Sequence, residues 1–140
     1  MRDRSLAEIV RNQHPLAMRP DTTVAQACAA MHQRQVGAVL VTDEDGRLLG
    51  IFTGRDAIRC LAEDCDARHA SLRKVMTQDP VTLGPGQSAM DALRLLDSSG
   101  FRHLPICHEG RVCGIVSRYD FRAMEHARLD EETGFFEVLR

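Results

Sequence analysis

The stretch Gly50-Ile51-Phe52-Thr53-Gly54-Arg55-Asp56 occurs a second time as Gly114-Ile115-Val116-Ser117-Arg118-Tyr119-Asp120. Both copies have a glycine, two apolar residues, a hydroxyl residue, two variable positions and an aspartate, in that order. Each copy leaves an apolar run that is typical of a strand and enters a run that is typical of a helix. The chain therefore places a hydroxyl and a carboxylate at a helix N-terminus twice.

The elements that precede this stretch are also repeated. Ser5-Leu6-Ala7-Glu8 has the capping-box pattern and predicts a short helix at about residues 6–10, and residues 71–76 form a similar segment. A proline then begins a short extended run in each half, at residues 15–18 and 80–83. The clearest helices follow, and their apolar faces are Val24, Ala27, Cys28 and Met31 in one half and Ala89, Ala92, Leu93 and Leu96 in the other.

Each half continues with two apolar strands around a short loop. The first pair is expected at residues 38–42 and 48–52, and the second at residues 103–108 and 111–116. Gly46 and Gly110 in the loops are typical of β-hairpins. The two preceding helices are expected to end at the steps Val36-Gly37 and Gly100-Phe101. A closing helix is expected at about residues 56–61 in the first half and 119–129 in the second.

This order of elements predicts an α/β (α+β) fold made of two pseudo-symmetric β-α-β-β-α repeats, with small sheets flanked by helices. One repeat has too few strands to be stable alone, so the two are expected to share one core. The predicted boundaries are residues 1–62 for the first repeat, 63–70 for a polar linker, 71–128 for the second repeat and 129–140 for a tail. The tail is expected to break at Gly134, before Phe135 and Phe136, which need a surface to pack on.

Charge and cysteine content exclude several classes of function. Eighteen Lys and Arg residues against twenty Asp and Glu give a net charge of 18 − 20 = −2, which is no footprint for nucleic acid. No apolar run is long enough for a bilayer, so a soluble cytoplasmic protein is expected. Five cysteines without CxxC spacing indicate neither a disulfide framework nor a zinc site, and the spacing of Cys60 and Cys65 is too weak a signal to use. A reducing compartment is the simpler interpretation.

The duplicated stretch and the order of elements resemble the tandem cystathionine-β-synthase-like (CBS) domain pair, also called a Bateman module. Residues 75–77, 80–81 and 101–106 are similar to that family too. The resemblance covers nearly the whole chain, from about Ser5 to His126. One departure concerns the first half, which has Arg11 where the second has Thr77, so the two sites are not expected to be equally competent.

The resemblance implies a regulatory module and not an enzyme. Family members bind adenine nucleotides or related adenosyl ligands in two clefts between the repeats, and pairs of modules commonly form disc-like dimers. It implies AMP, ADP, ATP or S-adenosylmethionine as a regulatory ligand, with no required cofactor, a homodimer, and an unidentified regulated protein. Thr53 and Ser117 would contact phosphate, Asp56 and Asp120 would hold the ribose hydroxyls, and the base would lie beside Gly37, Ala38, His103, Leu104 and Pro105.

The residue types suit this ligand on physical grounds. The N-terminus of a helix attracts phosphate through its free N–H groups and its dipole, and a hydroxyl adds a neutral donor. An aspartate one turn later can accept two hydrogen bonds from a ribose diol. Arg55 and Arg118 could reach phosphate oxygens, Gly54 permits close approach of the backbone, and Tyr119 is the only tyrosine.

Other interpretations remain open. The spacing Thr53-x-x-Asp56 also fits a capping box, with aspartate in place of the usual Glu or Gln, and Ser5-x-x-Glu8 shows the pattern where no ligand is expected. The cluster His103, Cys107, His108 and Cys113 suggests a metal, although the two sulfurs should face opposite sides of the hairpin. A structural dimerisation or partner-docking module is the main alternative function. A small enzyme ranks last because no base–nucleophile pair is visible.

Overall fold

The structure is a computed structural model that describes residues 3–138, with side chains described for residues 3–134. The chain divides into two compact units, which are treated separately below. The first-repeat unit contains residues 14–81 and 109–112. The second-repeat unit contains residues 1–13, 82–108 and 113–140.

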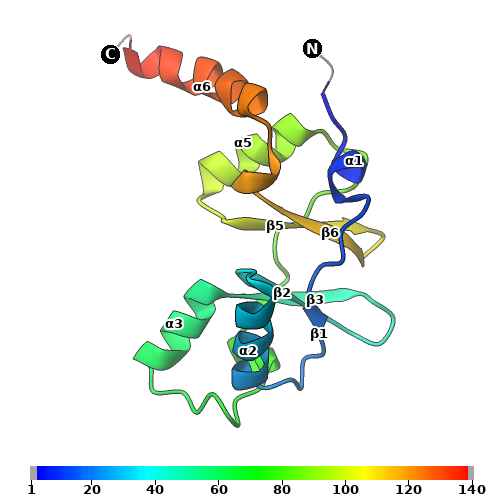
Figure 1. Ribbon diagram of the computed structural model, residues 1–140, viewed down its shortest axis with the longest axis vertical. Coiled ribbons are helices and arrows are strands. Elements are labelled where there is room, and N and C mark those ends of the chain that lie inside the picture. Colours follow the sequence, from blue (N-terminus) through cyan, green and yellow to red (C-terminus); the bar gives the residue numbers. More distant parts are fainter. Residues whose placement is uncertain (1–2, 139–140) are drawn as a thin grey trace. The chain divides into compact units, whose positions relative to one another are not determined.

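The first-repeat unit is a four-stranded sheet with helices on one side (Figure 1). Strand β1 pairs parallel with β2, and β2–β3 and β3–β4 are antiparallel. The strands are β1 (Ala17–Met18), β2 (Ala38–Thr42), β3 (Leu48–Thr53) and β4 (Thr77–Gln78), and the helices are α2 (Val24–Arg34), α3 (Gly54–Ala62) and α4 (Leu72–Val75).

Helix α2 illustrates how local sequence fixes an element. Thr23 accepts from the Gln26 N–H and its own N–H donates to the Gln26 side chain, which is a complete capping box. Val24 and Met31 on its apolar face are buried. The helix ends at Arg34 because Gln35 takes the left-handed conformation, with φ 55°. The predicted end at the Val36-Gly37 step was therefore too late, and a non-glycine residue makes the C-cap.

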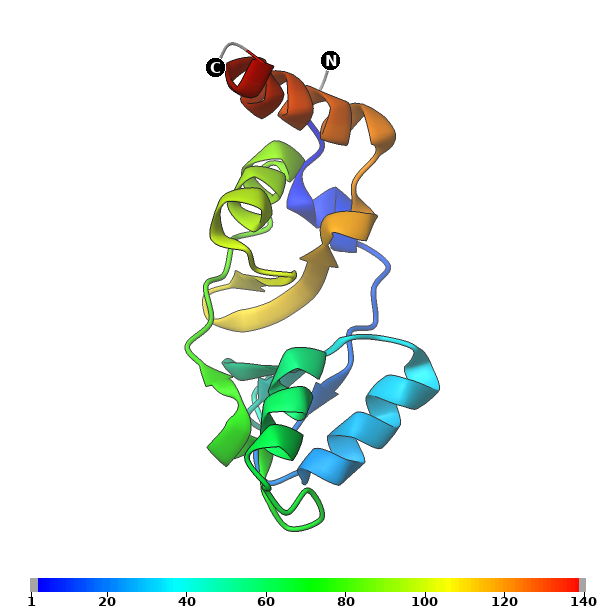
Figure 2. The ribbon, with the colours of Figure 1, turned by 90° about the vertical axis from the view of Figure 1, so that its left-hand side faces the viewer.

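The second-repeat unit contains its helices and the other hairpin apart from residues 109–112 (Figure 2). The hairpin turns at Glu109 and Gly110, whose φ angles of 52° and 82° suit a two-residue loop. Helices α1 and α5 lie on the same side of it. The elements are α1 (Leu6–Val10), α5 (Ala89–Ser99), β5 (His103–His108), β6 (Arg111–Ser117), a 3₁₀ turn η1 (Arg118–Asp120) and α6 (Ala123–Val138).

Each unit contains a hydrophobic core cluster of its own. The first-repeat core includes Phe52 and also Leu72, from the short helix α4 that opens the second repeat. The second-repeat core contains Leu93 and Leu104 together with Leu6 and Val10 of α1. The opening helix of each repeat therefore packs with the other repeat's strands.

The glycine that opens each repeated stretch is explained by this packing. A Cβ on Gly50 would lie 2.7 Å from the Thr77 carbonyl oxygen, and a Cβ on Gly114 would lie 2.5 Å from the Val10 Cβ. Carbon atoms normally pack ~3.5–4.0 Å apart, so only glycine fits at either position. The repetition of these glycines is visible in the sequence. Their physical reason is the close packing of the segments that open the two repeats.

Several predicted boundaries were wrong. The second extended run lies at β4, before Pro80, and within 80–83 only an isolated bridge from Leu83 to Ile106 forms. The closing helix of the second repeat is divided, because the extended residue Phe121 separates η1 from α6. Helix α6 then continues through Gly134, where a break was expected. The side chains of Phe135 and Phe136 lie outside the described residues.

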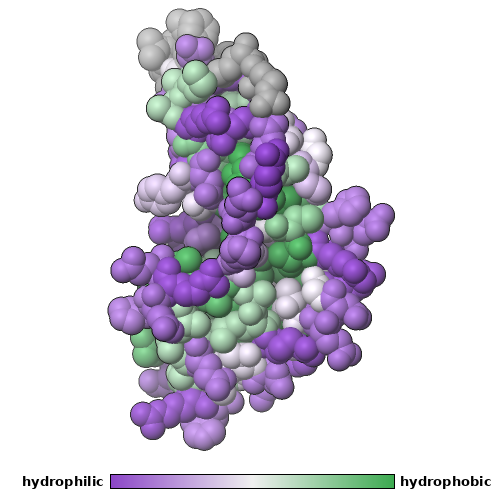
Figure 3. Space-filling model, turned by 45° about the vertical axis from the view of Figure 1, so that its right-hand side comes forward, coloured by the Kyte–Doolittle hydropathy of each residue, from purple (hydrophilic) through white to green (hydrophobic). Residues whose placement is uncertain are grey.

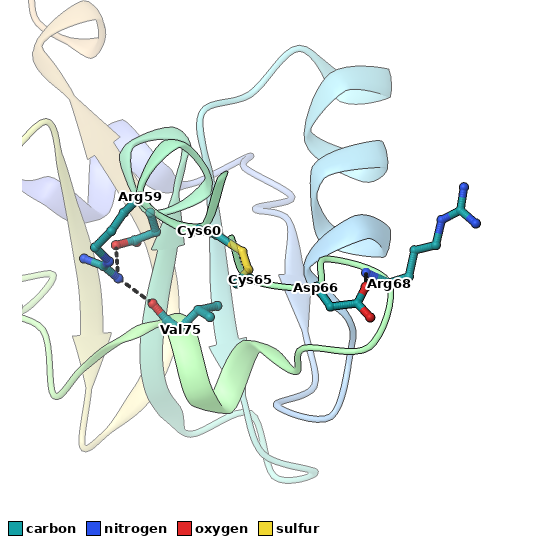
Figure 4. Close-up of a disulfide and its surroundings, with 7 residues drawn as sticks. Arg59, Cys60, Cys65, Asp66, Arg68 and Val75 are labelled. Atoms are coloured by element: carbon teal, nitrogen blue, oxygen red, sulfur yellow. Dashed lines mark hydrogen bonds and ion pairs between the residues drawn. A yellow bond between two sulfur atoms is a disulfide. The ribbon is translucent and has the colours of Figure 1, made fainter. Parts of the chain in front are cut away.

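The cysteine interpretation also needs correction. Cys60, in the last turns of α3, is joined by a disulfide to Cys65 in the segment that follows (Figure 4). Their Cα atoms are 5.0 Å apart, a separation that a disulfide spans. Cys60 is buried in the first-repeat core. The end of α3 turns the chain back on itself, which the spacing alone did not indicate.

Candidate functional site

The first candidate site is the junction between β3 and α3. Thr53 caps α3: its hydroxyl accepts from the Asp56 N–H at 3.4 Å, and its own N–H donates to Asp56 Oδ2 at 2.9 Å. The Thr53 hydroxyl in turn donates to Asp56 Oδ2 at 3.1 Å. The Gly54 N–H donates to the Gly37 carbonyl oxygen at 3.1 Å. The protein itself therefore satisfies much of this helix N-terminus.

The Asp56 carboxylate at this junction is also ion-paired. Its Oδ1 lies 3.0 Å from Nη2 of Arg59, one turn further along α3. The Asp56 side chain is only 6% exposed, whereas that of Arg59 is 49% exposed. The same Arg59 nitrogen donates to the Val75 carbonyl oxygen at 2.8 Å, as Figure 4 shows. Arg59 thus covers the carboxylate and links it to the end of α4.

The second candidate site is the junction between β6 and η1. The Ser117 N–H donates to Asp120 Oδ2 at 2.7 Å, and the Ser117 hydroxyl lies 3.4 Å from the same oxygen. The Tyr119 N–H donates to the Ser117 hydroxyl at 3.3 Å. Asp120 is exposed, in contrast to Asp56. The capping-box interpretation is confirmed at both junctions, but the two carboxylates differ in accessibility.

A partly buried ion pair holds the second junction in place. Nη2 and Nε of Arg4 donate to the Glu125 carboxylate at 2.6 and 3.1 Å, and Nη2 also reaches the Asp120 carbonyl oxygen at 3.2 Å. Burial alone would raise the pKa of Glu125, but the hydrogen bonds from Arg4 and from the Arg122 N–H outweigh it and leave that pKa lowered. The N-terminal segment therefore fixes the η1 turn that presents Asp120.

The predicted phosphate contacts lie on the surface. The Arg118 guanidinium is paired with Asp97 of α5 at 3.3 Å, and both side chains are substantially exposed. Such a surface pair is worth only about 0–1 kcal/mol, so Arg118 can leave it for a stronger anion. Arg55 is exposed at the start of α3, and Tyr119 is 97% exposed. All three have room to move toward a ligand.

The residues predicted to lie beside a base are of two kinds. Leu104 and Pro105 are buried, and Leu104 belongs to the second-repeat core. Ala38 is buried where β2 pairs with Thr53, and the preceding Gly37 is exposed. His103 begins β5, and its buried Nδ1 has no hydrogen-bond partner within the described part of the chain. His103 is thus the residue of this group with an unused polar atom.

The pKa of the His103 ring is lowered from its ordinary value. Burial lowers its pKa, the nearby charge of Arg102 lowers it further, and the Asp120 carboxylate acts in the opposite direction. The influence of Asp120 shows that this ring lies within electrostatic range of the second junction. The unpartnered Nδ1 of this imidazole can donate or accept one hydrogen bond.

The sequence did not single out Arg59, Arg4 or Glu125. Arg59 could have been recognised, because it lies three residues after Asp56 on the same helix face. Its counterpart in the second repeat, 64 positions later (59 + 64 = 123), is Ala123. The pairing of Arg4 with Glu125 spans 121 residues, and no local signal marks it.

The cysteine and histidine cluster of the second hairpin does not form a metal site. Cys107 and Cys113 are half-buried thiols outside the disulfide, and burial raises the pKa of Cys107. Within residues 3–134, no group of three or more His, Cys, Asp and Glu side chains is arranged to hold a metal ion.

Comparison with known proteins identifies the family to which a chain with these two junctions belongs. The CBS domain family model matches residues 6–63 and again residues 72–126, so both repeats and both junctions lie inside a match. The chain belongs to the CBS domain family. The expectation drawn from the resemblance is therefore confirmed for family and fold.

One sequence relative and two solved structures are similar to this chain over most of its length. The CBS domain-containing protein CBSCBSPB2 of Arabidopsis thaliana is 37% identical over 108 residues, which are 76% of this chain and 20% of that protein. This CBS chain spans about a fifth of the length of such relatives. The CBS domain protein PAE2072 from Pyrobaculum aerophilum, complexed with AMP, has a TM-score of 0.81 at 18% identity, covering 91% of this chain and 98% of that one.

The second solved structure is the CBS domain pair of protein MJ0100, in complex with 5′-methylthioadenosine and S-adenosyl-L-methionine. It has a TM-score of 0.77 at 19% identity and covers 94% of this chain and 98% of that one. At these identities the two structures establish the CBS fold of this chain. Among the described helices, none combines the length and the apolar character needed to cross a membrane.

Proposed function

We propose that this CBS pair is a regulatory sensor that binds an adenosine-type ligand at its strand-to-helix junctions. The observation that carries the proposal is the duplicated arrangement of a hydroxyl, helix N–H groups and an aspartate at both junctions of a CBS chain. The AMP, 5′-methylthioadenosine and S-adenosylmethionine in the solved relatives support this class of ligand.

Each part of such a ligand has a matching group. An aspartate carboxylate accepts hydrogen bonds from the ribose diol, and the helix N-terminus with its hydroxyl faces a phosphate or carboxylate. Arg118 and Arg55 add forked donors for an anion. The unpartnered Nδ1 of His103 offers one hydrogen bond to the base. Regulation follows if the ligand binds one conformational or association state more tightly than another.

A thermal-shift screen tests the proposal. Because a ligand that binds only the folded state stabilises it by mass action, a compound at 100 times its Kd adds about 2.7 kcal/mol. The purified chain should melt several degrees higher with at least one of AMP, ADP, ATP and S-adenosylmethionine at millimolar concentration. Unchanged melting curves with all four compounds would refute the proposal.

A structural dimerisation module is the second candidate, and one observation favours it. Ile58 and Leu61, three residues apart on α3, are 69% and 77% exposed, and Met124 on α6 is 54% exposed. Figure 3 shows a face on which hydrophobic residues are visible between hydrophilic ones. Apolar side chains on one helix face suit burial against a second copy of the chain. Light scattering of the Ile58→Glu variant, compared with the wild type, tests whether α3 supports a homodimer.

The proposal also concerns location and partner. We place the sensor in the cytoplasm, acting on a protein that remains to be identified, without nucleic acid or membrane as a partner. Cell fractionation tests the location, and recovery of the chain in a membrane or secreted fraction would contradict it.

A further inference from the structure

We infer that Arg59 closes the first-repeat junction, so that an adenosine ligand binds at the Asp120 junction and is kept from the Asp56 junction by an internal ion pair. The inference rests on the proposed function. It concerns which of the two repeated junctions is open, and it names the residue that decides this.

The first step is a count of free acceptor positions on each carboxylate. A carboxylate offers about four acceptor positions on its two oxygens. Asp56 Oδ2 already accepts from the Thr53 N–H at 2.9 Å and the Thr53 hydroxyl at 3.1 Å, and Oδ1 is paired with Arg59 at 3.0 Å. At most one position is left, whereas a ribose diol needs two.

The Asp120 carboxylate has free acceptor positions where those of Asp56 are occupied. Its Oδ2 accepts from the Ser117 N–H at 2.7 Å, and the Ser117 hydroxyl lies at the weak distance of 3.4 Å. Its Oδ1 has no hydrogen-bond or ion-pair partner within the described part of the chain. One whole oxygen of Asp120 is therefore open to a diol.

Exposure distinguishes the two carboxylates in the same direction. The Asp56 side chain is 6% exposed beneath the Arg59 guanidinium, and Asp120 is exposed. Arg59 is held over Asp56 by a second bond, at 2.8 Å, to the carbonyl oxygen of Val75. Displacing Arg59 therefore breaks two interactions at once, which makes the closure firmer than an isolated surface pair.

The backbone donors differ as well. The Gly54 N–H at the start of α3 donates to the Gly37 carbonyl oxygen at 3.1 Å and is not available to a phosphate. The equivalent pair in the second repeat would be the Arg118 N–H and the Arg102 carbonyl oxygen, and this bond is absent from the described hydrogen bonds. The first junction thus lacks one backbone donor that a bound phosphate would need.

The sequence contains the matching difference. Position 59 is arginine, and the corresponding position of the second repeat, 123, is alanine. The Arg59→Ala substitution therefore removes from the first repeat an arginine that the second repeat lacks at the corresponding sequence position. If Arg59 is the closing group, this single change opens the first junction.

Isothermal titration with AMP tests the inference. The wild type should bind one AMP per chain, and Asp120→Asn should abolish this binding. Arg59→Ala should bind two AMP per chain, the first junction gaining about tenfold or more in affinity from the loss of a charged, doubly bonded competitor. Arg59→Lys keeps a positive charge next to Asp56, so the number of AMP molecules bound per chain should stay close to one.

Matched controls separate this effect from general damage. Arg94→Ala removes another helix arginine with an i−3 aspartate partner, Asp91 at 3.5 Å, and should leave the stoichiometry at one. Melting curves without ligand confirm that each variant is folded. Two AMP per wild-type chain, unchanged AMP binding in a folded Asp120→Asn variant, or a stoichiometry of one in a folded Arg59→Ala variant would each overturn the inference and leave the proposed function standing. If neither wild type nor Arg59→Ala binds AMP, ADP, ATP or S-adenosylmethionine, the proposed function itself is wrong, and the inference with it.

Discussion

Replacing Gly114 by alanine tests the packing of α1 against the repeated stretch of the second repeat. The added Cβ would lie 2.5 Å from the Val10 Cβ and 2.7 Å from Gln13 Oε1. Because carbon atoms in contact prefer ~3.5–4.0 Å, the N-terminal segment has to move away from β6 by about 1 Å. The Val10 Cβ is fixed to the helix backbone and cannot rotate out of the way.

The cost has two parts. Forcing an extra methyl group into a packed core costs about 1–3 kcal/mol. The same displacement strains two hydrogen bonds, from the Ile115 N–H to Gln13 Oε1 at 2.9 Å and from Gln13 Nε2 to the Ile115 carbonyl oxygen at 2.8 Å. Each of these is worth about 1 kcal/mol. The expected total is about 3 kcal/mol, or a decrease in Tm of about 10 °C for a chain of this size.

Thermal and urea unfolding, followed by circular dichroism, measure this loss. Gly134→Ala is the matched control, because the same methyl group meets nothing within 4 Å inside α6. Alanine is a better helix former than glycine by about 1 kcal/mol, so the control should be unchanged or slightly more stable. If Gly114→Ala melts within about 2 °C of the wild type, α1 is not packed on Gly114 as described.

Three further predictions concern interactions that join distant parts of the second-repeat unit or the end of α3. Arg4→Ala leaves the Glu125 carboxylate buried without its partner and should lower the free energy of unfolding by about 3 kcal/mol. Arg128→Ala is the control, because it removes only exposed ion pairs and should change that free energy by less than about 1 kcal/mol. Urea unfolding of both variants measures the two changes. The folded pKa of Glu125 lies below its usual 4.5, so the stabilisation from its ionised carboxylate is complete above about pH 4.5 and is lost as the pH falls through the folded pKa. The difference in unfolding free energy between wild type and Glu125→Gln should therefore shrink on acidification. A constant difference down to about pH 2 would contradict this. Cys65→Ser opens the short loop to Cys60 and should lower the free energy of unfolding by about 2 kcal/mol in non-reducing buffer. Dithiothreitol should lower the stability of the wild type to nearly that of the variant. If reductant leaves the melting temperature of the wild type unchanged and all its thiols react with alkylating agents, the disulfide is absent.

Features set by neighbouring residues could be predicted from the sequence. The capping boxes at Thr53 and Ser117 need only residues three positions apart, and the hairpin at Gly110 needs only two turn residues with positive φ between apolar runs. The apolar face of α5 follows from helical spacing, and its predicted residues are buried. The duplication then identified the candidate junctions, since two matching copies are much less ambiguous than one.

Features set by distant contacts could not be predicted in this way. The division of the last helix at Phe121 accompanies the contact of Arg4 with Glu125 and with the Asp120 carbonyl oxygen, across more than 110 residues. The disulfide depended on the turn that brings Cys65 back to Cys60. In both cases the local sequence tolerates several backbone paths, and a partner from elsewhere selects one.

The sequence by itself determined the family, the two repeats and the residue types at both strand-to-helix junctions, because these depend on local spacing and on repetition. Only the tertiary structure decided that α1 packs with the second repeat and α4 with the first, and that Gly114 and Gly50 are the points of closest approach. It also decided that Asp56 is buried while Asp120 is exposed. The physical reason is that burial depends on which segments pack over a residue, and identical motifs acquire different surroundings when different neighbours cover them.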